Sequence, residues 1–108
     1  MNNAYLLAEL VATYRKYGWE FRCALLQPAT LAEIPAEMLA NATVKEAEFD
    51  GLWFSRPSHN NRDAWELRLL AQTQYALFEA FEPDETEEER DEAKREMEAK
   101  MRDYVLRQ

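Results

Sequence analysis

Residues 56–62 gather side chains that could bind an anion. They read Arg-Pro-Ser-His-Asn-Asn-Arg and include the only histidine of the sequence. Arginine guanidinium groups hold carboxylates and phosphates through paired hydrogen bonds. Tryptophans stand close to the segment on both sides. The pattern predicts a site for a small anionic ligand, formed by Trp53, Arg56, His59, Arg62 and Trp65.

Turn geometry offers a second interpretation of residues 56–62. Proline, asparagine and serine favour turns, because they restrict the backbone or hydrogen-bond to it locally. The segment also lies between two stretches that read as strands, where a hairpin connection is expected. No glycine-rich loop between a strand and a helix, the usual phosphate cradle, is present. Both interpretations remain open at this point.

Catalytic and metal chemistry have little support in the sequence. Cys23 and His59 are the only residues of their types, so the usual cysteine- and histidine-based zinc sites are excluded. Cys23 falls in a predicted strand on the side of Trp19 and Phe21, where burial would make its thiol unreactive. Carboxylates are plentiful, but no calcium-binding loop pattern occurs. We expect no catalytic activity, no metal and no cofactor.

Residues 82–92 contain eight carboxylates and a single arginine. One interpretation is a solvated helix start, because acidic side chains favour the positive end of the helix dipole. Thr86 with Glu89 three residues later has the pattern of a capping box. The other interpretation is a docking surface for a basic protein partner.

Composition limits the remaining partner classes. Twenty-one acidic and thirteen basic residues give a net charge of −8, which repels a nucleic-acid backbone, so we expect no nucleic-acid partner. No apolar run reaches the roughly 18 residues that span a bilayer, and no signal peptide is evident, so no membrane association is expected. The single cysteine cannot form an internal disulfide. These features together predict a cytoplasmic protein.

Helices are predicted at both ends of the sequence. Near the N-terminus, apolar residues recur every three or four positions up to Tyr17, after an asparagine cap and before Gly18. Towards the C-terminus, a helix follows Thr86 and has a narrow apolar stripe. Its stripe comprises Ala93, Met97, Met101, Tyr104 and Val105. Residues 28–41 predict two short helical turns, because Pro35 interrupts them.

Strands are predicted between the helices. Apolar and polar residues alternate over 19–25 and 65–69, and aromatic residues favour a strand at 74–81. Residues 44–56 also read as strand, with Asp50-Gly51 in the middle. We favour a glycine bulge within one long strand there over a hairpin turn.

These elements predict one α+β domain over residues 1–108. Its small antiparallel sheet of three to four strands would be covered on one face by the N-terminal and C-terminal helices. Four apolar residues fall out of phase and would lie on the open face, where a second copy could bury them. They are Leu26, Leu52, Phe54 and Leu70. We therefore predict a small cytoplasmic protein-interaction or scaffold domain, homodimeric and non-catalytic. The alternative is a module for a small anionic ligand at residues 56–62.

Overall fold

The computed structural model describes residues 2–108, which form the predicted α+β fold. Its elements in chain order are α1 (Asn3–Lys16), β1 (Glu20–Leu26), α2 (Pro28–Glu33), η1 (Ala36–Leu39), β2 (Thr43–Glu46), β3 (Gly51–Pro57), η2 (His59–Asn61), β4 (Asp63–Leu69), β5 (Ala76–Phe81) and α3 (Glu87–Leu106). The N-terminal helix, the two short turns after Gln27 and the C-terminal helix agree with prediction. So does the strand over residues 76–81.

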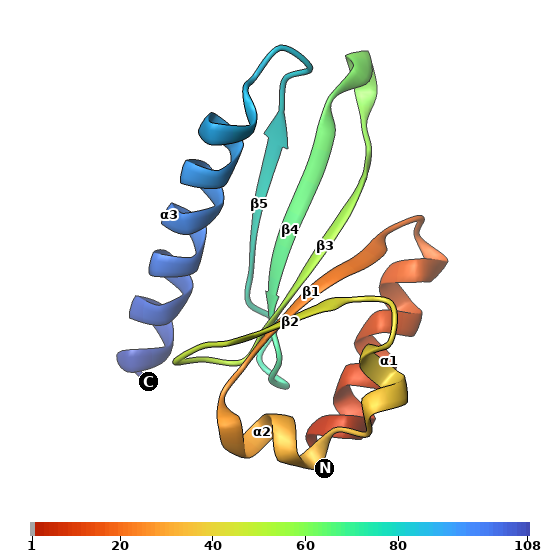
Figure 1. Ribbon diagram of the computed structural model, residues 1–108, viewed down its shortest axis with the longest axis vertical. Helices are drawn as coiled ribbons and strands as arrows, with labels where there is room; N and C mark the ends of the chain where they lie inside the picture. The colour runs from red at the N-terminus through yellow and green to blue at the C-terminus, as the bar shows by residue number, and fades with distance from the viewer. Residues whose placement is uncertain (1) are drawn as a thin grey trace.

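The sheet has five strands in the order β2-β1-β3-β4-β5 (Figure 1). It is mixed, and larger than the predicted antiparallel sheet of three to four strands, because β2 pairs with β1 in parallel. A parallel return needs a crossover connection, and α2 and η1 supply it. The predicted long strand over 44–56 is two strands, β2 and β3. They do not form a hairpin either, because β1 lies between them.

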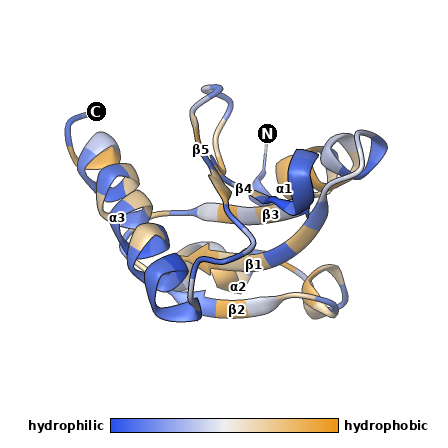
Figure 2. Ribbon diagram, turned by 90° about the horizontal axis from the view of Figure 1, so that it is seen from above, coloured by the Kyte–Doolittle hydropathy of each residue, from blue (hydrophilic) through white to orange (hydrophobic). Residues whose placement is uncertain are grey.

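The two long helices cover opposite faces of the sheet, rather than one face as expected (Figure 2). Leu52 and Phe54 of β3 lie under α1, whereas Trp53 between them faces α3. A strand directs successive side chains to opposite faces. β3 is buried along most of its length, with five consecutive buried residues, and therefore requires a cover on each side.

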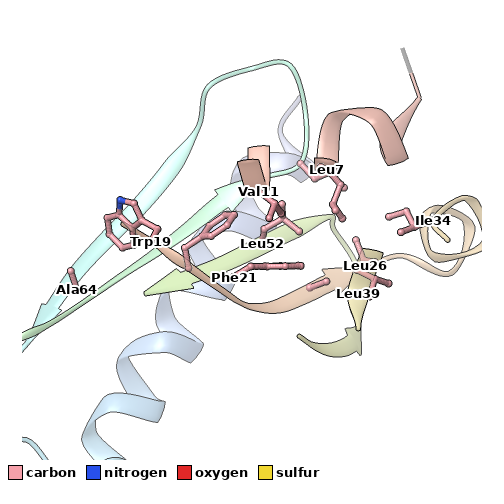
Figure 3. Close-up of a cluster of buried hydrophobic side chains, with 12 residues drawn as sticks. Leu7, Val11, Trp19, Phe21, Leu26, Ile34, Leu39, Leu52 and Ala64 are labelled. Atoms are coloured by element: carbon pink, nitrogen blue, oxygen red, sulfur yellow. The ribbon is translucent and has the colours of Figure 1, made fainter. Parts of the chain in front are cut away.

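The four apolar residues that led to the predicted homodimer are buried in the core under α1. Leu26, Leu52, Phe54 and Leu70 all belong to this buried cluster. Figure 3 shows Leu7 and Val11 of α1 directed towards the sheet residues. Burial beneath α1 and α2 therefore removes the apolar face on which the predicted dimer was based.

A β-bulge in β1 sets which side chains face α3. The register with β3 shifts between Phe21 and Cys23. Phe21 lies in the cluster under α1, but Cys23 packs against the cluster under α3. The extra residue of a bulge reverses the alternation of side chains beyond it. Cys23 is therefore half-buried on the α3 side, not buried beside Trp19 and Phe21 as predicted.

The Asp50-Gly51 pair forms the corner that leads into β3. The Asp50 carboxylate accepts hydrogen bonds from the Gln27 amide (2.9 Å) and from the Thr30 hydroxyl (2.8 Å), so it ties this corner to the start of α2. A Cβ atom at Gly51 would lie 3.0 Å from the Phe49 ring. The glycine therefore serves close packing at a strand start, rather than a bulge or a hairpin turn.

Candidate functional site

A groove of about 950 Å³ lies between α3 and the β1–β2 side of the sheet. Its lining includes Arg22, Lys45, Trp53, Trp65, Lys94 and Arg95. We call this depression the cationic groove. It opens because α3 packs along β4 and β5 (Figure 1), which leaves the α3-facing side of β1 and β2 without a helix over it.

Positive charge is concentrated in the cationic groove. Four basic side chains line it, against the two carboxylates of Asp91 and Glu98, although the whole chain carries −8. Within residues 2–108, Lys45, Lys94 and Arg95 make no salt bridge. In a chain with surplus acids, neighbouring cations without carboxylate partners form a local site that favours anions.

The side chain of Lys94 lies over the ring of Trp65, and both residues line the groove. Its Nζ is 3.4 Å from the centroid of the Trp65 ring, a cation–π contact. Trp65 packs edge-to-face on Trp53, with ring centroids 6.0 Å apart. Burial lowers the pKa of the Lys94 amine, while nearby Asp91 acts in the opposite direction. The ammonium is thus partly desolvated, and an anion beside it would meet a weakly screened charge.

Glu98 and Cys23 also line the groove. The Trp53 Nε1–H donates to Glu98 Oε2 at 2.9 Å, so this carboxylate has a structural partner. Burial raises the pKa of the Cys23 thiol, against the opposing effect of Lys45. A thiol with a raised pKa is mainly protonated at neutral pH and is a poor nucleophile.

The five residues predicted as an anion site do not share one location. Arg56 donates to the Tyr17 carbonyl (2.6 Å) and stacks over Trp19, on the face covered by α1. Arg62 pairs with Glu82 at 2.8 Å, and His59 is exposed in η2. Only the two remaining members, Trp53 and Trp65, lie together, and they do so in the cationic groove.

The segment 56–62 has the backbone of a hairpin connection. Asn60 and Asn61 adopt positive φ angles of 58° and 61°, a conformation that asparagine tolerates better than most residues. The Ser58 amide donates to the Arg62 carbonyl at 2.8 Å and closes the loop. Turn geometry therefore accounts for the asparagines of the segment.

Several acids of residues 82–92 have partners inside the molecule. Glu89 completes the predicted capping box with Thr86, and these hydrogen bonds lower the pKa of its carboxyl group. The Glu82 carboxylate pairs with Arg62 (2.8 Å), and the Glu85 carboxylate accepts from the Glu82 amide (2.8 Å). Most of the other carboxylates are exposed. Docking of a basic partner here stays a prediction.

No protein-family model matches the chain, and neither the curated proteins nor the solved structures contain a significant match to it. Among residues 2–108, no helix is both long and apolar enough to cross a membrane. The same residues contain no group of three histidine, cysteine or carboxylate side chains that could hold a metal ion.

Sequence reasoning missed the four basic residues of the groove. Lys94 and Arg95 are adjacent in an acid-rich helix, and that pairing was the one available signal. Nothing near Lys45 or Arg22 in the sequence connects them with α3. Lys45 approaches α3 through the parallel β1–β2 pairing, and Arg22 lies at the bulge in β1.

Proposed function

We propose that the chain is a non-catalytic protein-interaction domain that binds an acidic segment of another protein in the cationic groove. The observation that supports this proposal is the cluster of unpaired cations, Lys45, Lys94 and Arg95, in a chain of net charge −8. The proposal keeps the predicted interaction role and an anionic ligand. It moves the ligand from residues 56–62 to the groove.

The geometry favours a peptide over a single small anion. The groove is open and large, and its cations come from β1, β2 and α3 rather than from one loop. Charges spread in this way match several carboxylates along a chain, since each pairs with a separate cation. A cytoplasmic location is part of the proposal, and the free thiol of Cys23 is consistent with it.

Charge reversal in the groove tests this function. We expect the capped peptide Glu-Val-Glu-Val-Glu-Val to change the fluorescence of the groove tryptophans and to bind. Lys94→Glu should weaken binding by about tenfold or more, which corresponds to the loss of about 1.4 kcal/mol. The measurement is a fluorescence titration at fixed salt.

Lys100→Glu is the matched control. It makes the same charge change on the same helix, at an exposed residue outside the groove lining. Its effect on affinity should be small, because its charge is exposed to solvent and lies outside the groove, where it is screened. Absence of binding to the wild-type protein, or equal losses in the two variants, would contradict the proposed function.

Homodimerisation is a second proposal, supported by a different surface from the one first predicted. Phe78 of β5 is 57% exposed and Tyr17 after α1 is 63% exposed. The Phe78 ring makes an edge contact with Trp19, which places it on the α1 side of the sheet. An exposed phenylalanine on an edge strand is a surface that a second copy could cover.

A further inference from the structure

The outer edge of β2 is open to pairing with another strand. β2 ends the strand order and pairs only with β1, and all four of its residues are exposed. The Ala47 amide donates to the Leu26 carbonyl, so the backbone groups of Ala47 point towards β1. Along a strand, the N–H and C=O groups of every second residue point in the same direction. Val44 and Glu46 therefore direct their N–H and C=O groups outwards.

The open edge borders the cationic groove. The side chains of Thr43 and Lys45, which alternate with Val44, line the groove on the side of α3. In Figure 2, α3 stands to one side of β2, and its residues Lys94, Arg95 and Glu98 line the groove together with Lys45. A strand added to β2 would thus turn every second side chain towards the groove.

We propose that the acidic segment binds as an extended strand added to the open edge of β2, with a carboxylate at every second position facing the groove. This inference rests on the proposed function and specifies its binding mode. β2 has four residues, and at about 3.3 Å per residue it is matched by a segment of about four to six residues. Backbone hydrogen bonds supply affinity, and the groove selects acidic side chains.

The chemistry of the edge favours an acidic partner strand over a second copy of β2. Lysine on an edge strand opposes self-association, since two copies would bring their like charges together. Against an alternating acidic strand, Lys45 instead becomes an ion-pair donor next to Lys94 and Arg95. Because β2 is short, the backbone bonds alone would be weak without these charges.

Val44→Pro tests the binding mode without removing a groove cation. Proline deletes only the outward amide of Val44, so the hydrogen bonds between β2 and β1 can remain. We expect this variant to bind the Glu-Val-Glu-Val-Glu-Val peptide about tenfold more weakly or worse. Val44→Ala, which keeps the amide, should bind like the wild type. Circular dichroism and thermal melts confirm that each variant is folded.

A modified peptide provides an independent measurement if Val44→Pro fails to fold. Methylation of the backbone nitrogens on one edge of the same peptide leaves its carboxylates intact but blocks pairing on that edge. Two such peptides cover both edges, and one of them should lose binding to the wild-type protein. If Lys94→Glu weakens binding while Val44→Pro and both methylated peptides bind normally, strand addition is overturned and the proposed function stands. If Lys94→Glu has no effect, the proposed function fails as well.

Discussion

Lys94 carries its charge in surroundings that favour the neutral amine. Burial is the main cause of its lowered pKa, and Lys45 and Arg90 add to the effect by repulsion. Asp91 and Glu87 act in the opposite direction, as does the π face of Trp65. A carboxylate from a partner would favour the charged form, so binding and protonation of Lys94 should be coupled.

We predict that peptide affinity falls as pH rises, beginning below 10.5, the ordinary pKa of lysine. The peptide's carboxylates stay ionised across this range, so the loss reflects the amine of Lys94. The contribution of Lys94 to folding stability should change in the opposite direction. Comparison with the Lys94→Arg protein separates it from those of Cys23 and Tyr14, whose raised pKa values make rising pH destabilising. The unfolded chain holds the Lys94 proton more tightly, so raising the pH through the lowered pKa favours the folded state. Fluorescence titrations from neutral pH upwards, run beside urea melts, measure both trends.

Lys94→Arg in a Cys23→Ala background is the control for this pH dependence. Arginine keeps its charge at high pH, and the Cys23→Ala change removes the thiol that also faces the groove. Affinity in this background should then depend less on pH than with lysine at position 94. An equal fall in both proteins would show that another group causes the loss.

Among single residues, the sequence predicts a side chain's environment only while the backbone stays regular. Alternation over 19–25 correctly indicates a strand, and Phe21 is buried as expected. Beyond the bulge, the faces are reversed, and Cys23 reaches the groove. The bulge in β1 contains no glycine or proline, so the amino-acid composition of the strand does not reveal it. The clustering of Arg22, Lys45 and Lys94 therefore could not be anticipated.

At the scale of elements, α3 depends on a narrow seam. Met97 and Met101 are its only buried residues, and they pack on the cluster around Leu67 and Trp53. Near the C-terminal end of the helix, Tyr104 stacks on Tyr75 with ring centroids 3.6 Å apart. Surface ion pairs contribute little to such a helix, so most of its stability comes from this seam.

We predict that Met97→Asp destabilises the protein by about 2–4 kcal/mol, because it buries a carboxylate without a partner. Since α3 forms one wall of the groove, this variant should also lose peptide binding. Glu88→Ala, at an exposed position of the same helix, should change stability by less than about 0.5 kcal/mol. Urea melts compare the two variants, and a wild-type midpoint for Met97→Asp would contradict a buried seam.

Elements with local signals were predicted better than their arrangement. The capping box and the apolar stripe define α3 within the chain, and the structure confirms both. The parallel pairing of β2 depends on a crossover through residues 27–42, which no periodicity within β2 can reveal. That pairing is also what separates β2 from β3 and creates the groove wall.

At the scale of the whole molecule, the net charge is negative, whereas the groove is lined mainly by positive charges. A chain of −8 repels an acidic partner at long range, whereas the groove attracts it at short range. Moderate salt weakens the long-range repulsion more than the contacts within a partly buried groove. The charges of the protein therefore stabilise the bound acidic partner, but they do not speed up its association.

The same repulsion bears on the proposed homodimer, which we expect to strengthen with salt because both copies carry −8. Sedimentation at micromolar concentration should show a species of twice the 12.7 kDa chain mass. Phe78→Glu should yield a folded monomer, whereas Leu106→Glu, at another exposed apolar position, should not. A single 12.7 kDa species for the wild type at both low and high salt would rule the dimer out.

The strand order also has a consequence for how the chain folds. Strands β3, β4 and β5 are joined by short connections at 58–62 and 70–75, so this meander closes at little entropic cost. β1 must find β3 across about thirty residues of sequence, and β2 can add only to a β1 already in place. We expect β2 to be the last strand to form and the first to open. The groove wall is thus the part of the molecule that a bound strand would stabilise most.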